Sequence, residues 1–183
     1  MKEPRVIGAL IRKEREALEG IVGAEAVVAA LRTLPEEMRE EYSTVRTLTR
    51  IRTRTVEAVY GAVAAETGRE VMRLHRELVR VSMESAMRGV WRSLLRFTSD
   101  EALVRRAPLV FSRGLSAGEL NARIVRPGSA EIRLTGWSGV TDMQINGIAA
   151  GAETVLSCAG RESVRVASHR TLDGACWIAT WHV

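Results

Sequence analysis

Apolar residues recur at helical spacing through roughly the first hundred positions of the chain. Val6, Leu10 and Ile21, for example, belong to one stripe along a first helix. Proline, glycine and acidic residues then mark where further helices begin and end. The pattern predicts a first helix from near Val6, a short second helix that ends near Pro35, a third that starts at Pro35, a fourth over Ser43–Glu66 and a long fifth from Arg69 to about Phe97.

One more short helix is predicted after the long one. Thr98 or Ser99 is a suitable N-cap, because its hydroxyl can accept a hydrogen bond from a backbone N–H of the first turn. Proline lacks a backbone N–H and clashes with the preceding turn. We therefore expect this helix to end near Arg106, before Pro108.

Beyond Leu120 the spacing changes to the alternation typical of strands. A first β-hairpin is predicted around Arg126-Pro127-Gly128-Ser129 and a second around Asp173-Gly174, since both places carry turn-forming residues between alternating segments. Between the two hairpins, apolar residues from Ile145 to Ala159 lie at helical spacing. The carboxyl-terminal part is therefore predicted to be hairpin, helix, hairpin.

These elements predict one α+β domain of 183 residues, in which an amino-terminal helical layer packs on a small antiparallel sheet. Residues 1–118 form its mainly helical part and residues 119–183 its hairpin-helix-hairpin part. The longest uncharged runs, Met143–Ala152 and Gly174–Val183, are about half of the ~20 residues that a membrane-spanning helix needs. Because the first residues also lack the apolar core of a signal peptide, we expect a cytoplasmic protein without a membrane span.

The net charge of +5 comes almost entirely from arginine, since the chain has only two lysines. Arginine binds phosphate and carboxylate groups in a bidentate manner, although a GC-rich genome also favours arginine. On the predicted fourth helix, Arg46, Arg50 and Arg54 fall on one line without nearby acidic residues. This line is either a surface for an acidic protein partner or a plain solvated face. Nucleic acid is disfavoured, because the net charge is modest and the segment has no aromatic stacking residues.

Few residues suggest catalytic or metal chemistry. Cys158 and Cys176 show no metal-ligand spacing and are expected to be free, buried thiols. Asp173, Cys176 and His182 can be written as a catalytic triad. However, Cys176 and His182 lie on one predicted strand at a separation of about 20 Å, too far for direct contact. We therefore expect no metal, no cofactor and no enzyme activity.

Aromatic and large aliphatic residues gather around the junction between the long helix and the first hairpin. They either pack the core, where aromatic rings contribute much of the burial, or form the wall of a ligand pocket. The candidate pocket residues are Trp91, Leu94, Leu95, Phe97, Phe111 and Trp137.

Three parts of the chain resemble a known superfamily. They are the segment VIGALIRKEREALEGIVGAEAVVAAL, the block VAAETGREVMRLHRELVRVSMESAMRGVWRSLLRF and the closing hairpin, helix and hairpin. The superfamily joins H-NOX haem sensors, 4-vinyl-reductase-type ligand-binding domains and TRAPP trafficking subunits. Shorter motifs, among them GWSGV and RTLDGACW, resemble a family of uncharacterised myxobacterial paralogues. The resemblance covers nearly the whole chain and implies a helical layer on a small sheet, with a hydrophobic cavity between them.

In the H-NOX branch of this superfamily, haem fills the cavity and is held by a proximal histidine and a Tyr-x-Ser-x-Arg motif. Here the stretch APLVFSRGLSAGEL has no histidine, and the strand that should carry the motif is Ile132-Arg133-Leu134-Thr135-Gly136-Trp137. The histidines of the chain are His75, on the predicted long helix, and His169 and His182, in the last hairpin. Both haem determinants are missing, so we expect a haem-free protein.

Together these observations predict a non-enzymatic regulatory module, a haem-free sensor that binds a lipophilic small molecule in a hydrophobic cavity. Members of the superfamily often pair, which implies a homodimer or a complex with a related paralogue. The alternative is a protein-interaction scaffold, in which side chains fill the cavity and the line of Arg46, Arg50 and Arg54 contacts an acidic partner.

Overall fold

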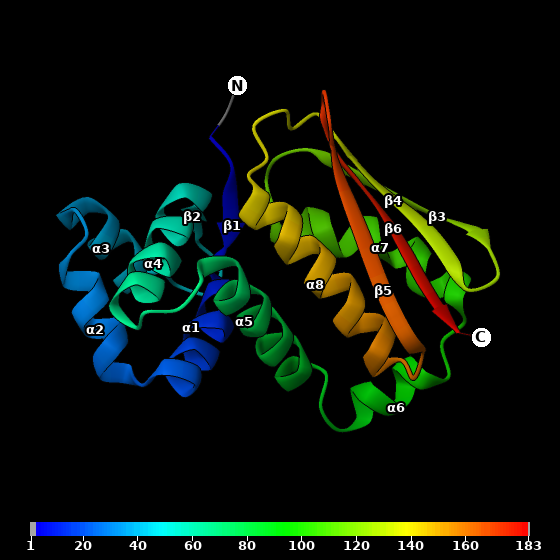
Figure 1. Cartoon of the computed structure of the whole chain (residues 1–183), viewed down its shortest axis with the longest axis horizontal. Helices are drawn as coiled ribbons and strands as arrows, with labels where there is room; N and C mark the ends of the chain where they lie inside the picture. The colour runs from blue at the N-terminus through cyan, green and yellow to red at the C-terminus, as the bar shows by residue number, and fades with distance from the viewer. Residues whose placement is uncertain (1–2, 183) are drawn as a thin grey trace. The chain divides into compact units, whose positions relative to one another are not determined.

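The computed structural model describes residues 3–182, and the chain divides into two compact units (Figure 1). The helical unit contains the described residues up to Ser82 together with Gly114–Ser116. The sheet unit contains Met83–Arg113 and the described residues from Ala117 onward. Within residues 3–182, no helix combines the length and the apolar character that crossing a membrane requires.

The helical unit combines short strands with helices. In chain order its elements are β1 (Arg5–Ile7), α1 (Gly8–Val22), α2 (Ala24–Arg32), α3 (Glu36–Ser43), β2 (Arg50–Arg52), α4 (Thr53–Glu66) and the part of α5 (Val71–Ala86) that ends at Ser82. The first three predicted helices are confirmed. The first of them begins only after Ile7, because Val6 pairs with Ile51 in an antiparallel two-stranded sheet.

The predicted helix over Ser43–Glu66 is wrong in its first half. Residues 44–49 form a loop, and Arg50–Arg52 are a strand rather than a helix. Pairing with β1 satisfies the backbone groups of this strand, and the β-branched threonines nearby favour extended backbone. The loop passes directly over the start of α1, since a Cβ on Gly8 would lie 2.0 Å from the carbonyl oxygen of Arg46.

Side chains from helices α1 to α5 form the core of the helical unit. Its largest fully buried members include Leu18, Tyr60 and Leu78. Removing each such side chain from water contributes about 1.5–3 kcal/mol to the free energy of unfolding. The same core also contains two titratable side chains, Glu14 and His75.

The sheet unit contains the fold's four-stranded sheet. After the end of α5 its elements are α6 (Val90–Arg96), α7 (Asp100–Gly114), β3 (Glu119–Arg126), β4 (Ser129–Thr135), α8 (Asp142–Cys158), β5 (Glu162–Thr171) and β6 (Gly174–His182). All strands pair antiparallel in the order β3-β4-β6-β5, so the two hairpins meet through β4 and β6. The α+β class and the hairpin, helix, hairpin arrangement are therefore confirmed.

Helix α8 lies along one face of this sheet (Figure 1). It begins with a capping box, in which the backbone N–H of Gln144 donates to the hydroxyl of Thr141 at 3.2 Å. In return, the backbone N–H of Thr141 donates to the side-chain Oε1 of Gln144 at 3.0 Å. The indole Nε1 of Trp177 donates to the carbonyl oxygen of Ile145 at 3.0 Å. This buried hydrogen bond fixes the start of α8 on β6.

The predicted continuous helix from Arg69 to Phe97 is wrong, because α5 and α6 are separate. Gly89 adopts a φ of +68° between them, which interrupts the helix. The helix predicted to end before Pro108 instead continues through it to Gly114. A proline inside a helix costs about 3 kcal/mol. Burial of Phe111 and partial burial of Leu103 and Val104 offset this cost.

Candidate functional site

The sheet unit contains an apolar pocket with a volume of about 540 Å³. Its walls come from α7, from α8 and from the face of the sheet that α8 covers, and the end of α5 and Leu95 of α6 complete it. Every residue of the wall belongs to the sheet unit. The volume lies within the range of about 300–1,000 Å³ that is usual for small-molecule sites.

Strand and helix periodicity explain how these elements present their apolar side chains. Every second side chain of a strand points to the same face of a sheet. The sheet contributes Leu120, Ala130, Ile132, Ala179 and Trp181 to the wall. On a helix, side chains three or four positions apart share a face. Helix α8 contributes Ile148, Gly151, Ala152, Val155 and Leu156.

Two methionines line the pocket at the end of α5. Met83 lies in the last turn of α5 and Met87 directly follows the helix, with its backbone N–H donating to the carbonyl oxygen of Met83 at 3.0 Å. A Cβ on Gly151 would lie only 3.3 Å from Sδ of Met83, so the glycine lets this thioether approach α8. Methionine side chains are flexible and polarisable, which allows this wall to adapt to the shape of a ligand.

A polar network holds α7 on the sheet beside the pocket. The carboxylate of Asp100, at the start of α7, accepts hydrogen bonds from Nε of Arg161 at 2.7 Å and from Nε1 of Trp181 at 3.0 Å. Arg161 also donates to the carbonyl oxygens of Thr98 and Ala159 at 2.7 and 2.6 Å. The side chains of Arg161 and Asp100 are only 15% and 20% exposed. The network therefore fixes α7 against Trp181, a residue of the pocket wall.

Arg106 is the one charged side chain among the twenty described residues that line the pocket. It lies three residues after Leu103 and four before Val110, both of which also line the pocket, so it belongs to the same stripe of α7. Arg106 lines the pocket and is itself an exposed residue, so it lies where the pocket opens to solvent. The described part of the structure gives this guanidinium no hydrogen-bond or ion-pair partner.

Two of the candidate pocket residues, Leu95 and Phe111, are among the lining residues. Trp137 is buried, with 2% of its surface exposed, but it lies outside the wall. The side chain of Trp91 lies outside the described residues.

Leu94 and Phe97 lie outside the wall, and they are 53% and 90% exposed. The helix predicted from Arg69 to about Phe97 includes both residues. The interruption at Gly89 changes the helical phase, so residues on either side of it no longer share one face. Most of the wall on α8 and the sheet was not among the candidates, although the periodicity of those elements carried a signal for it.

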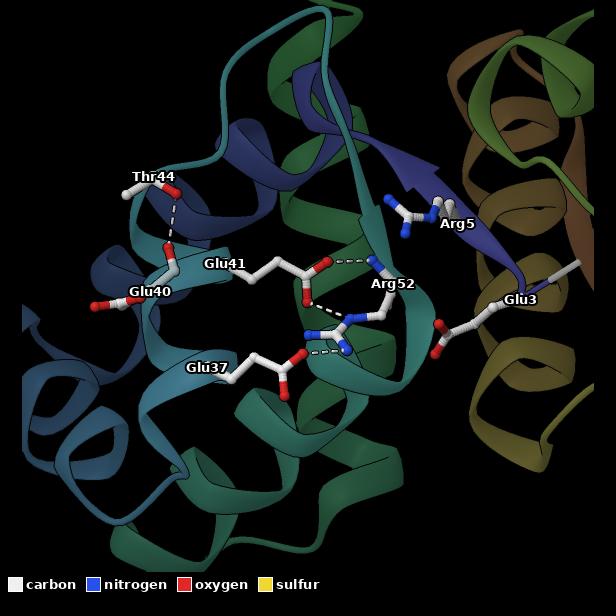
Figure 2. Close-up of a pocket in the computed structure, with 7 residues that line it drawn as sticks. All are labelled: Glu3, Arg5, Glu37, Glu40, Glu41, Thr44 and Arg52. Atoms are coloured by element: carbon white, nitrogen blue, oxygen red, sulfur yellow. Dashed lines mark hydrogen bonds and ion pairs between the residues drawn. The ribbon is translucent and has the colours of Figure 1, made fainter.

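The helical unit has a separate, open hollow of about 710 Å³ with polar walls (Figure 2). Arg52 forms ion pairs there with Glu37 at 2.6 Å and with Glu41 at 2.8 Å. Glu41 also accepts a hydrogen bond from the hydroxyl of Thr55. Burial alone would raise the pKa of Glu41, but the hydrogen bonds from Thr55 and Arg52 and the charge of Arg52 outweigh it and lower the pKa. These groups satisfy one another and tie α3 to β2 and α4.

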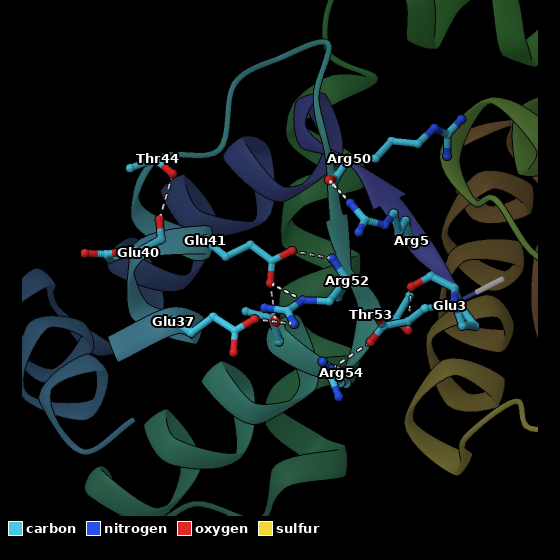
Figure 3. Close-up of polar contacts among 12 residues, drawn as sticks. Glu3, Arg5, Glu37, Glu40, Glu41, Thr44, Arg50, Arg52, Thr53 and Arg54 are labelled. Atoms are coloured by element: carbon cyan, nitrogen blue, oxygen red, sulfur yellow. Dashed lines mark hydrogen bonds and ion pairs between the residues drawn. The ribbon is translucent and has the colours of Figure 1, made fainter. Parts of the chain in front are cut away.

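The predicted line of Arg46, Arg50 and Arg54 is not formed. Arg46 lies in the loop after α3, Arg50 in β2 and Arg54 in the first turn of α4. Nε of Arg54 forms an ion pair of 2.7 Å with Glu3, as Figure 3 shows. Arg50 donates to the carbonyl oxygen of Gly114 at 3.3 Å. The line required a helix over residues 43–52, which the β1–β2 pairing replaces.

Both cysteines are free and buried, as expected. The triad of Asp173, Cys176 and His182 is not assembled: Asp173 accepts a hydrogen bond of 2.9 Å from the backbone N–H of Gly136. The strand register instead places His169 directly opposite Cys176, a pairing that the sequence alone does not reveal. Burial raises the pKa of Cys176, which keeps this thiol protonated and weakly nucleophilic. Within residues 3–182, no three His, Cys, Asp or Glu side chains are arranged to hold a metal ion.

A buried polar cluster in the helical unit was not predicted. The hydroxyl of Tyr60 donates a hydrogen bond to the carboxyl group of Glu14, and its ring centroid lies 5.5 Å from that of His75. Burial raises the pKa of Glu14 to about 7 and lowers the pKa of His75 to about 4. The hydroxyl of Tyr42 and Nδ1 of His75 are buried without a hydrogen-bond partner among the described residues. The signal in the sequence was the position of Glu14 within the apolar stripe of α1.

The sequence matches no protein-family model and no curated protein. Its fold, however, is similar to solved H-NOX structures. An oxygen-binding H-NOX domain related to soluble guanylate cyclases has a TM-score of 0.67 and 14% identity, covering 96% of this chain and 95% of that chain. An unliganded Fe(II) H-NOX variant from K. algicida has a TM-score of 0.72 and 10% identity, covering 97% of each chain. A third H-NOX structure, described as probing the function of haem distortion, has a TM-score of 0.69 and 15% identity, covering 96% of this chain and 95% of that chain.

The likeness extends over nearly the whole chain and shows that it has the H-NOX fold. The fold implied by the sequence resemblance is therefore confirmed. At identities of 10–15%, the comparison shows the fold alone.

Proposed function

We propose that this chain is a non-enzymatic regulatory module that binds a lipophilic small molecule in the apolar pocket of the sheet unit, without haem. The observation that carries the proposal is the pocket of about 540 Å³, whose lining is uncharged apart from one arginine. Apolar pockets of this size with few polar groups are typical of small-molecule sites. The H-NOX fold supports the proposal, since one structural neighbour is described as oxygen-binding.

The residues of the wall do not suit a haem group. Haem iron is usually held by a histidine, a cysteine thiolate or a tyrosine, and none of these lines the pocket among the described residues. The histidines lie elsewhere, on α5, β5 and β6. Met83 and Met87 offer thioethers, but a methionine ligand to haem normally acts together with a histidine.

The wall also lacks the groups that enzymes use. Among the described lining residues there is no serine, threonine, cysteine, histidine, aspartate or glutamate to act as a nucleophile or as a general acid or base. Binding without chemistry is therefore the role that this pocket supports best.

A pair of matched variants tests the proposal with Nile red, an uncharged dye that fluoresces in apolar surroundings. Ala107→Phe adds a ring on the pocket side of α7, whereas Ser112→Phe adds the same ring at an exposed position of the same helix. We expect saturable dye binding by the natural chain and by Ser112→Phe, and loss of most binding in Ala107→Phe. Absence of saturable binding, or equal binding by all three proteins, would overturn the proposal.

Native mass spectrometry of the protein purified from its own organism complements this test. We propose a homodimer, or a heteromer with a related paralogue, that carries a bound metabolite. An adduct of small-metabolite mass supports the sensor. A complex with an acidic protein partner and no adduct, combined with failure of dye binding, supports the scaffold alternative instead.

A further inference from the structure

We infer that the ligand of the apolar pocket is an amphiphile, with an anionic head that binds Arg106 at the mouth and an apolar body that fills the interior. The inference rests on the proposed function, because it specifies the chemical class of molecule that the same pocket takes. The head is a carboxylate or a phosphate, the two groups that a guanidinium binds in a bidentate manner.

The position of Arg106 in an otherwise apolar stripe is the first observation. Leu103, Ala107 and Val110 of α7 line the pocket around it. Arg105, its neighbour in sequence, is also exposed but does not line the pocket. Successive residues of a helix point about 100° apart, so Arg106 lies on the pocket side of α7 and Arg105 does not.

The second observation is that, among the described residues, Arg106 has no ion-pair partner and no other charged side chain lines the pocket. The indole N–H of Trp181 is the other polar side-chain group of the wall, and it already donates to Asp100. No acidic side chain lines the pocket among the described residues. Among the described residues, a ligand with an anionic head would therefore meet one side-chain cation in the wall, and Arg106 would gain an ion pair when the ligand binds.

The geometry also separates the two parts of the ligand. Arg106 is exposed, so the head lies at the surface, where water still solvates it in part. The interior consists of Ile132, Val155, Leu156 and similar side chains, which favour hydrocarbon over any polar group. The apolar body thus supplies most of the affinity, and the head sets the orientation.

Decanoate and decanol provide the test, because they share a hydrocarbon chain and differ in the charge of the head. Isothermal titration calorimetry compares their affinities for the natural chain, for Arg106→Gln and for the matched control Arg105→Gln. We expect Arg106→Gln to weaken decanoate by roughly five- to tenfold, the effect of a partly exposed charged hydrogen bond, and to leave decanol unchanged. Arg105→Gln should change neither affinity, and Arg106→Lys should recover part of the loss. Decyl phosphate in the same series distinguishes a phosphate head from a carboxylate.

Salt gives an independent readout, because screening weakens the binding of decanoate and not that of decanol. If decanol and decanoate bind with equal affinity, and Arg106→Gln affects neither, the inference is wrong while the pocket remains a ligand site. If neither molecule binds the natural chain, the proposed function fails together with the inference. If Arg105→Gln weakens decanoate as much as Arg106→Gln does, general surface charge explains the binding and the inference is again wrong.

Discussion

The indole Nε1 of Trp181 donates a hydrogen bond of 3.0 Å to Oδ2 of Asp100, a residue 81 positions earlier in the chain. The other carboxylate oxygen of Asp100 accepts from Arg161. One carboxylate therefore connects the start of α7 to β6 and to the residue that precedes β5. Because Trp181 and α7 are both walls of the pocket, this contact couples the stability of the sheet unit to the shape of the pocket.

Replacing Asp100 by alanine should destabilise the chain more than an equivalent change at an exposed ion pair. Asp100→Ala leaves the largely buried guanidinium of Arg161 without its carboxylate, which we expect to lower the free energy of unfolding by about 2–3 kcal/mol. Asp142 and Arg170 form an ion pair of similar length, 2.6 Å, but their side chains are 84% and 43% exposed. Asp142→Ala should therefore cost at most about 1 kcal/mol.

Urea denaturation of both variants measures this difference, and Nile red affinity reports on the pocket. We expect the dye to bind more weakly to Asp100→Ala than to Asp142→Ala, because α7 loses its attachment at one end. Equal losses of stability in the two variants would show that the burial of the Asp100 pair contributes nothing.

The close packing around Gly174 predicts that adding a single methyl group there destabilises the sheet. A Cβ at this position of β6 would lie 2.2 Å from the carbonyl oxygen of Leu134, on the neighbouring strand β4. Backbone atoms of a central strand pair cannot move away without breaking hydrogen bonds. We therefore expect Gly174→Ala to lower the free energy of unfolding by about 3 kcal/mol or more.

Gly139 supplies the control for Gly174, since a Cβ there would meet no atom within 4 Å. Gly139→Ala should change the free energy of unfolding by no more than about 0.5 kcal/mol. Thermal unfolding followed by circular dichroism compares the two variants. A Gly174→Ala protein as stable as Gly139→Ala would show that β4 and β6 tolerate a wider separation.

The sheet and its central helix could be predicted because their signals are local. Alternation of side chains, the turn at Pro127-Gly128 and the apolar stripe of α8 each depend on residues close together in sequence. The same reasoning placed the helices of the amino-terminal part. It was wrong at Arg50–Arg52, since that strand forms only when Arg5–Ile7, far away in sequence, pairs with it.

The pocket was harder to predict, because its wall depends on how separate elements meet. Gly89 interrupts the predicted long helix, and its left-handed backbone is one of several conformations that a glycine can adopt. The continuation of α7 through Pro108 depends on tertiary burial that outweighs a local rule. His169 opposite Cys176 required the register of β5 on β6.

The buried cluster of the helical unit contains two groups whose stability effects oppose each other. The carboxyl group of Glu14 accepts a hydrogen bond from the hydroxyl of Tyr60 and lies near Tyr42. The guanidinium carbon of Arg15 lies 5.9 Å from the centroid of the Tyr42 ring. Burial raises the pKa of Glu14 from 4.5 to about 7, so the folded chain binds more protons there than the unfolded chain. Burial lowers the pKa of His75 from 6.5 to about 4, so the folded chain binds fewer protons there.

These shifts predict the pH dependence of the natural chain relative to Glu14→Gln. The stabilising contribution of Glu14 is complete below pH 4.5 and is lost as the pH rises to about 7. That of His75 is complete above pH 6.5 and is lost as the pH falls to about 4. Between pH 4.5 and 6.5 the two groups change the free energy of unfolding in opposite directions and by nearly the same amount. The natural chain alone therefore shows neither pH dependence.

Glu14→Gln removes the pH dependence that Glu14 contributes and leaves that of His75. Its free energy of unfolding, measured relative to the natural chain, should therefore rise by about 3 kcal/mol as the pH increases from 4.5 to 7. Urea denaturation at a series of pH values measures this difference, in which the contributions of all other groups cancel. Glu16→Gln, an exposed carboxylate on the same helix paired with Lys13, controls for the change from Glu to Gln. A difference for Glu14→Gln that stays constant across this range would mean that the buried carboxyl group keeps its ordinary pKa and that water reaches the interior of the helical unit.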